Sequence, residues 1–123
     1  MNDTTQQTAG VHSAPTLEPK SYQVNFGEFI GIGENGNLWV EDCDVKELAE
    51  QFGSPLFIVS ESQFRYCYRQ FRDAFKSRYP AEVQILFANK SNNSLALRHI
   101  MNQEGAGGDC FGVNEMYIAL LAG

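Results

Sequence analysis

Lys90 is the residue of this sequence whose type and position best suit covalent chemistry. It closely follows residues 83–88, a mainly apolar run of strand length. An amine at the end of a buried strand is sheltered from water, and burial disfavours the charged form of an amine. A neutral amine is a nucleophile that can form a Schiff base with an aldehyde or another carbonyl compound. We therefore expect a sheltered, reactive amine at position 90.

Two carboxylates, Asp109 and Glu115, flank the end of another strand-like segment, residues 107–111. Taken alone, Glu115 suits the first turn of a helix and Asp109 suits a loop. Enzymes built on parallel strands, however, place their chemistry at the carboxyl ends of those strands. Since Lys90 ends one such strand and Asp109 lies near the end of the next, we expect a carboxylate that can orient a protonated Schiff base.

The elements that must position these side chains alternate between strands and helices. Residues 22–32 and 37–40 are predicted to form strands joined through a type I′ turn at Asn35-Gly36. The sequence Gly31-Ile32-Gly33-Glu34-Asn35-Gly36 also matches a dinucleotide-binding pattern, but a strand-like run follows it where that pattern needs a helix, so a hairpin is favoured. Further strands are predicted at 56–59, 83–88 and 107–111, and helices at 45–52, between Ser60 and Pro80, between Leu95 and Gly105, and at 115–122.

This alternation predicts an α/β fold with a parallel sheet and right-handed crossovers. A doubly wound open sheet and a (β/α)₈ barrel are both compatible with it. A barrel needs about 250 residues, and the chain has 123. We therefore expect the front part of a longer protein.

Composition excludes several classes of function. The formal net charge of −6 and the pI of about 4.8 argue against nucleic acid or an anionic membrane as the main partner. The three cysteines are widely spaced and form no zinc-binding pattern, so we expect no metal site and a reducing, cytoplasmic setting. No apolar run approaches the roughly 20 residues needed to cross a bilayer.

Three segments, in order, resemble the fold-type III pyridoxal-phosphate decarboxylases, particularly the diaminopimelate decarboxylases. That family carries Tyr-Ala-Val-Lys-Ala-Asn, whose lysine binds the cofactor, and the corresponding Phe87-Ala88-Asn89-Lys90-Ser91-Asn92 keeps the alanine, the lysine and the last asparagine. Upstream, residues 53–59 resemble the family's Gly-Thr-Pro-Leu-Tyr-Val-Tyr entry into the first barrel strand. Downstream, residues 107–116 resemble Gly-Phe-Asp-Val-Val-Ser-Gly-Gly-Glu-Leu and keep its aspartate and glutamate at positions 109 and 115.

The resemblance implies a fold and a set of site residues. The chain would be the N-terminal part of a (β/α)₈ TIM-type barrel, preceded by a β-hairpin that belongs to a second, β-rich domain. Residues 1–20 would be a flexible tail, 21–45 the hairpin and 46–123 the first βα units of the barrel. Pyridoxal 5′-phosphate would form a Schiff base with Lys90, the catalytic lysine, and Ala88, Asp109 and Glu115 would also contact the cofactor.

The resemblance also implies a function. The full-length protein would be a pyridoxal-phosphate-dependent decarboxylase that converts meso-diaminopimelate to L-lysine, active as a homodimer on a small amino-acid substrate. Ornithine, arginine and carboxynorspermidine decarboxylases and alanine-racemase-like enzymes share the lysine segment and stay open as alternatives, as does a catalytically inactive regulatory relative. The 123-residue chain by itself is expected to be inactive and to bind the cofactor weakly or not at all.

Overall fold

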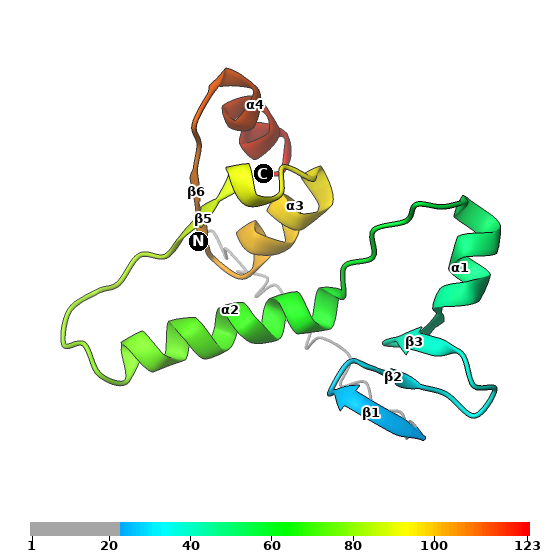
Figure 1. The fold of residues 1–123 in the computed structure, drawn as a ribbon. Coiled ribbons are helices and arrows are strands. Elements are labelled where there is room, and N and C mark those ends of the chain that lie inside the picture. Colours follow the sequence, from blue (N-terminus) through cyan, green and yellow to red (C-terminus); the bar gives the residue numbers. More distant parts are fainter. Residues whose placement is uncertain (1–22) are drawn as a thin grey trace, which may run out of the picture.

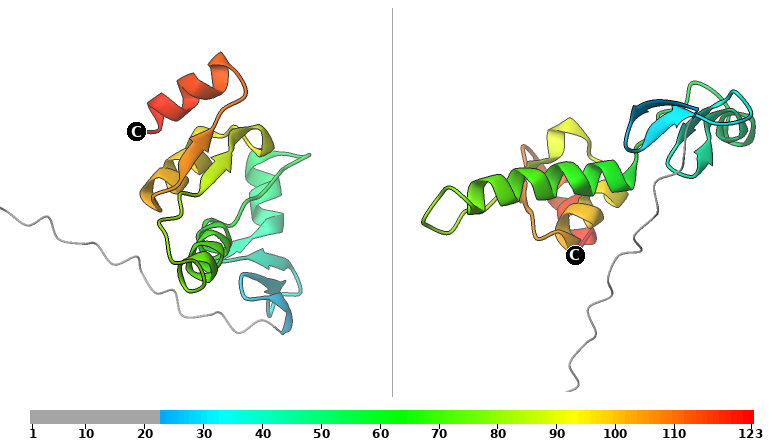
Figure 2. Two further views of the ribbon diagram at one scale, coloured as in Figure 1. Left: turned by 90° about the vertical axis from the view of Figure 1, so that its left-hand side faces the viewer. Right: turned by 90° about the horizontal axis from the view of Figure 1, so that it is seen from below.

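The computed structural model describes residues 23–123. An antiparallel sheet and a helix lie at one end of the molecule, an α/β part lies at the other, and a long helix runs between them (Figures 1 and 2). In chain order the elements are β1 (Val24–Gly27), β2 (Ile30–Ile32), β3 (Leu38–Val40), β4 (Cys43–Asp44), α1 (Val45–Phe52), α2 (Glu61–Lys76), β5 (Leu86–Ala88), the 3₁₀ turn η1 (Asn89–Ser91), α3 (Leu95–Gln103), β6 (Gly107–Asp109) and α4 (Val113–Leu121).

The N-terminal strands form an antiparallel sheet in the order β1-β2-β3-β4. The predicted hairpin is confirmed in the pair β2–β3, where Ile32 lies opposite Leu38. The type I′ turn is wrong. A type I′ turn needs a positive φ at both central residues. Here Gly36 has a φ of 76°, but the φ of Asn35 is not positive. A second difference is that residues 22–32 do not form one strand, because a turn at residues 28–29 separates β1 from β2.

Asp44 fastens this sheet to α1. Its Oδ1 accepts a hydrogen bond from the Lys46 backbone N–H at 2.8 Å and so caps the N-terminus of the helix. Its Oδ2 accepts from the side-chain amides of Asn35 at 2.8 Å and Asn37 at 2.7 Å. The bond from Asn37 does most to lower the pKa of Asp44 below its usual value. One buried carboxylate therefore couples the hairpin turn to the start of the helix.

The core lies where α2 crosses α3. Leu97, Ile100, Met101 and Ala106 are buried there, and Phe64, Tyr68 and Phe87 pack against them. The aromatic residues along one face of α2 therefore belong to the core in the first half of the helix. Phe71 and Phe75 contact each other but remain about half exposed, because the second half of α2 extends beyond α3 (Figure 1).

β5 and β6 form a parallel pair, as the alternation of elements predicted. The run at residues 56–59 is not a strand. It has no partner among the described residues, and Phe57 is 95% exposed. Apolar sequence alone does not make a strand, because the backbone also needs a hydrogen-bonding neighbour. The described residues thus form an α/β structure with one parallel pair, and the closure of a barrel stays a prediction.

The expected tail and the expected division into domains fall outside what the structure tests. The tail at residues 1–20 lies outside the described residues, and the assignment of residues 21–45 to a second domain stays a prediction. Among residues 23–123 no helix is both long and apolar enough to cross a bilayer.

Candidate functional site

The ends of β5 and β6 bring the predicted site residues to one edge. Ala88 is the last residue of β5, and its register partner on β6 is Asp109. Lys90 follows two residues later, in η1. Because the two strands are parallel, Lys90 and Asp109 extend from the same end of the pair. The expectation that Lys90 and Asp109 follow the same end of two neighbouring parallel strands is therefore met in the backbone arrangement.

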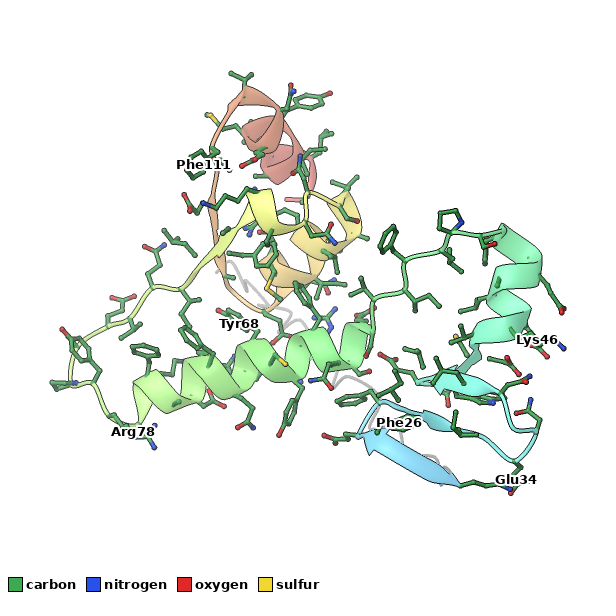
Figure 3. The ribbon with its side chains drawn as sticks, in the orientation of Figure 1. Phe26, Glu34, Lys46, Tyr68, Arg78 and Phe111 are labelled. Atoms are coloured by element: carbon green, nitrogen blue, oxygen red, sulfur yellow. The ribbon has the colours of Figure 1, made fainter. Side chains whose placement is uncertain are left out.

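Lys90 itself is exposed rather than sheltered, so that part of the expectation is wrong. The buried position after β5 is taken by Asn89, which is 1% exposed. The 3₁₀ turn then directs the next residue outward, and among the described residues β6 is the only strand paired with β5. The Lys90 amine is 4.3 Å from the centre of the Phe111 ring, a contact typical of a cation and an aromatic face. Figure 3 shows Phe111 on the connection between β6 and α4.

The side chain of Asn89, the residue before Lys90, links the ends of β5 and β6. Its side-chain N–H donates to the Cys110 sulfur at 3.2 Å. The Oδ1 of the same side chain is buried and has no hydrogen-bond partner in the described part of the chain. Cys110 is half-buried, whereas Cys43 and Cys67 are exposed. Asparagine at this position therefore gains one weak bond to sulfur and leaves one acceptor unsatisfied.

Glu115 has a different partner from the one expected. It lies in the first turn of α4, and its Oε2 accepts a hydrogen bond from the Phe111 backbone N–H at 2.7 Å. The N-cap residue of α4 is Gly112, which has no side chain to cap the helix. Within residues 23–123 no ion pair joins Lys90 to Asp109 or to Glu115. Glu115 thus shapes the β6–α4 connection, and through it the position of the Phe111 ring.

Arg98 is a residue that the sequence reading missed. It is 5% exposed, and its guanidinium donates to the carbonyls of Ala106 and Gly107, both at 2.9 Å, and to the side chain of Asn102. A Cβ at Gly108 would lie 3.4 Å from its Cζ, so glycine leaves the group room. The interaction holds the start of β6 against α3. The only sequence signal is a basic residue beside the apolar residues of that helix.

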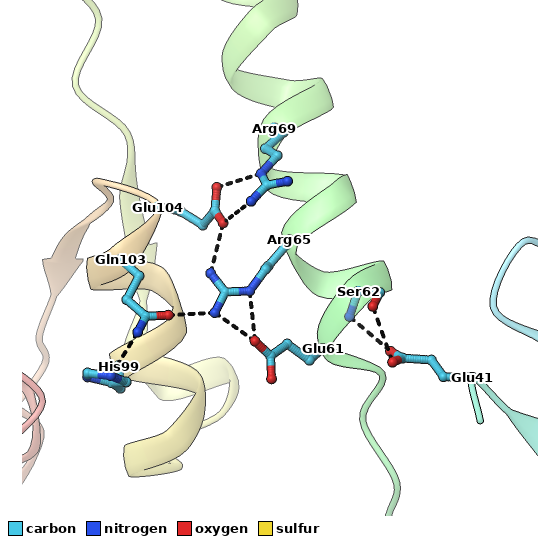
Figure 4. A network of polar contacts seen from close by, with 8 residues as sticks. All are labelled: Glu41, Glu61, Ser62, Arg65, Arg69, His99, Gln103 and Glu104. Carbon is cyan, nitrogen blue, oxygen red and sulfur yellow. Dashed lines mark hydrogen bonds and ion pairs between the residues drawn. The ribbon is translucent and has the colours of Figure 1, made fainter. Parts of the chain in front are cut away.

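An ion-pair network holds α3, in turn, against α2 (Figure 4). Glu104, just after α3, pairs with Arg69 at 2.6 Å and with Arg65 at 2.8 Å. The Glu104 side chain is only 6% exposed. The hydrogen bond from Arg69 does most to lower the pKa of Glu104 below its ordinary value of 4.5. The carboxylate is therefore charged at neutral pH and fixes the helix that carries Arg98.

A hollow in the described surface lies away from this edge. An open cavity of about 650 Å³ lies near the start of β5, with Gln84, Ile85 and Gly105 in its wall. This is the opposite end of the strand from Lys90. Residues 23–123 contain no group of three side chains that could hold a metal ion.

The residues at the edge fit the attachment end of an aldehyde cofactor. A Schiff base needs a primary amine that the aldehyde can reach, and the exposed Lys90 amine meets this need without a carboxylate partner in the described range. Asp109, also exposed, adds a negative charge to the same edge. The buried Oδ1 of Asn89 is a further polar atom beside this position that lacks a partner in the described residues. The arrangement can bind a carbonyl compound covalently and orient it by charge.

Comparison with known proteins identifies relatives of this chain. No family model matches it. It is 36% identical over 94 residues to the diaminopimelate decarboxylase of Methanothermobacter thermautotrophicus, covering 76% of this chain and 22% of the relative. It is 38% identical over 91 residues to that of Synechocystis sp., covering 74% and 19%. The structure of this chain superposes on the crystal structure of the diaminopimelate decarboxylase of Methanocaldococcus jannaschii in complex with L-lysine. The TM-score is 0.69 at 33% identity, and the match covers 76% of this chain and 22% of that one. The chain thus spans about a fifth of the length of these relatives.

Proposed function

Since this chain belongs by sequence and fold to the diaminopimelate decarboxylase family, we propose that it supplies the lysine-bearing part of a pyridoxal-phosphate-dependent decarboxylase. The complete enzyme would convert meso-diaminopimelate to L-lysine. The observation that supports this most is the parallel pair β5–β6, which sends Lys90 and Asp109 out from the same end. The names of the relatives, and the L-lysine in the M. jannaschii structure, favour this substrate over the other amino acids.

Each residue at the edge has a distinct part in the proposal. Lys90 provides the amine to which the cofactor attaches. Asp109 would provide negative charge beside that amine and so help to orient it. Ala88 is the register partner of Asp109 and so sets the spacing of the two strand ends. Glu115 holds the connection between β6 and α4 through the Phe111 backbone.

Pyridoxal phosphate, when bound, supplies the electron sink that accepts the electrons left when the substrate loses its carboxylate. The task of the protein is to bind and orient. Lys90 and Asp109 are both exposed, so the edge is open to a small amino acid. The family resemblance further leads us to propose that the complete site forms in a homodimer.

A chimeric enzyme tests this function. The segment of the Methanocaldococcus jannaschii diaminopimelate decarboxylase that aligns with this chain, 92 residues long, would be replaced by the corresponding segment of this chain. We expect the purified chimera to release carbon dioxide from meso-diaminopimelate and to form L-lysine. Lys90→Met should abolish this turnover, because the attachment amine is lost.

The matched control for that variant is Lys46→Met, which removes an exposed lysine from α1 and should leave turnover unchanged. A chimera that binds pyridoxal phosphate and is fully active with methionine at position 90 would exclude the proposed role of Lys90. A chimera that folds and binds the cofactor but releases no carbon dioxide from meso-diaminopimelate would exclude the proposed function of this segment.

A further inference from the structure

We propose that Phe111 is a positioning residue for Lys90, whose ring holds the lysine amine at the Asp109 side of the strand ends and restrains its reaction with aldehydes. This role of Phe111 rests on the proposed function, because restraint of Lys90 matters only if Lys90 is the attachment point of the cofactor. The contact on which it is based does not depend on any cofactor.

The Lys90 amine lies close to the Phe111 ring. The Lys90 Nζ lies 4.3 Å from the centre of the Phe111 ring, within the range of about 6 Å over which an ammonium group is attracted to the face of an aromatic ring. Phe111 follows Asp109 by two residues, and Asp109 is the register partner of the last residue of β5. The ring therefore reaches across from the neighbouring strand to the residue that follows β5.

Hydrogen bonds next to Phe111, rather than packing in the core, hold its ring in place. Phe111 is 73% exposed, so packing in the core does not fix it. Its backbone N–H instead donates to the Glu115 carboxylate at 2.7 Å, a charge-assisted bond of the stronger kind. The Asn89–Cys110 bond ties the residue before Phe111 to the residue before Lys90. One bond thus holds the backbone of Phe111, and a weaker side-chain bond links the residues that precede Phe111 and Lys90.

The aromatic character of Phe111 has a chemical consequence for Lys90. An aliphatic residue at position 111 would present no aromatic face to the amine. An aromatic ring stabilises the charged amine, which is the form that cannot attack a carbonyl carbon. In this chain an incoming aldehyde must therefore compete with the ring for Lys90.

Reductive methylation of the 123-residue chain measures this competition without any cofactor. In each step a neutral lysine amine condenses with formaldehyde and releases water, and cyanoborohydride then delivers hydride to the carbon of the protonated imine. Peptide mass spectrometry would give the rate at Lys90 relative to the rate at Lys46. Lys46 serves as an internal control, because its side chain is 68% exposed and it lies in α1, away from this edge.

We expect Phe111→Leu to raise the Lys90-to-Lys46 rate ratio about two- to fivefold, as the loss of an exposed cation–π contact predicts. Phe111→Trp should restore the ratio of the original protein or lower it further, since indole has the stronger face. Glu115→Gln should raise the ratio by a smaller factor than Phe111→Leu, because the weakened bond leaves the ring less well held.

A spectroscopic readout separates positioning from a general change in structure. The ¹³C-dimethyl groups introduced at Lys90 should resonate upfield of those at Lys46 because of the Phe111 ring current. The difference should vanish in Phe111→Leu and persist in Phe111→Trp. An unchanged rate ratio in the leucine variant, or no upfield shift at Lys90 in the original protein, would overturn the proposal. Neither result would bear on decarboxylation by the chimera, so the two proposals fail separately.

Discussion

Ala88 and Asp109 are register partners at the last pair of the β5–β6 ladder. This pairing places the segment that carries Lys90 and the segment that carries Phe111 beside each other as the two strands end. It also means that any shift in β6 would move Asp109 and Phe111 together relative to the lysine. The groups that hold β6 are therefore as relevant to the proposed chemistry as the lysine itself.

The charge of Asp109 can be removed at almost constant shape. In the chimera, Asp109→Asn should lower kcat by at least about tenfold, because one hydrogen bond to a charged group contributes about 1.5–3 kcal/mol. Since the side chain is exposed, the variant should unfold at the same urea concentration as the unsubstituted chimera. Steady-state kinetics and a urea titration measure the two effects, and a variant with undiminished kcat would exclude a role for this carboxylate.

Glu104→Gln tests the ion-pair network between α2 and α3. The two arginines would lose their shared partner, and we expect the free energy of unfolding of the chain to fall by about 1–3 kcal/mol at pH 7. Urea denaturation followed by circular dichroism measures this loss. Lys46→Gln, which breaks only the exposed pair with Glu50, is the control and should change stability by less than about 0.5 kcal/mol.

The same carboxylate gives the stability a pH dependence. The folded-state pKa of Glu104 lies below its ordinary value of 4.5, so the stabilisation is complete above that value. It is lost as the pH falls below 4.5 and through the folded-state pKa. The difference in unfolding free energy between the original chain and Glu104→Gln should therefore shrink in this range. A difference that stays constant from pH 7 to pH 3 would contradict the assignment.

Asn89→Val would remove a buried acceptor that has no partner in the described residues, together with one weak bond to Cys110. An unsatisfied buried polar group costs about 1–3 kcal/mol, whereas a bond to sulfur contributes little. We expect the valine variant to unfold at a higher urea concentration than the original chain. Equal or lower stability would show that the Asn89 side chain is better satisfied than the structure indicates.

Arg98→Met keeps an unbranched side chain but removes the donors to Ala106 and Gly107. We expect hydrogen exchange to become faster for the backbone amides of residues 107–111, because the start of β6 is no longer held against α3. Amides in α1, which lies at the other end of the molecule (Figure 1), should exchange at their original rates. Uniform acceleration across the chain would point to general destabilisation instead.

Local signals in the sequence predicted much of the fold. Ser60 caps α2 through the Gln63 N–H at 2.9 Å, and Gly53 closes α1 with a φ of 82°, close to the helix limits that the sequence predicted. The buried face of α3 is harder to derive from the sequence. Ile100 and Met101 are buried, whereas Leu95 is 45% exposed and Leu97 lies in the core. A shift of two residues along a helix changes its face, and only the packing partners settle which face is buried.

The candidate site was predicted in its backbone but not in its contacts. The parallel pairing of β5 and β6 places Lys90 and Asp109 at one edge, as the alternation of elements predicted, and the structure adds the register. The exposure of Lys90 and the partner of Glu115 depend on how a three-residue turn and a helix start are shaped. Phe111 and Arg98 gave little signal, because an aromatic residue after a strand and an arginine in a helix each have ordinary structural explanations.

Trapping of the cofactor shows whether Lys90 is its attachment point. The chimera would be incubated with pyridoxal 5′-phosphate, reduced with borohydride, digested and mapped by mass spectrometry. We expect a phosphopyridoxyl group on Lys90, absent from Lys90→Met and retained in Lys46→Met. A folded chimera that carries no adduct at Lys90, or carries it on another lysine, would contradict the claim.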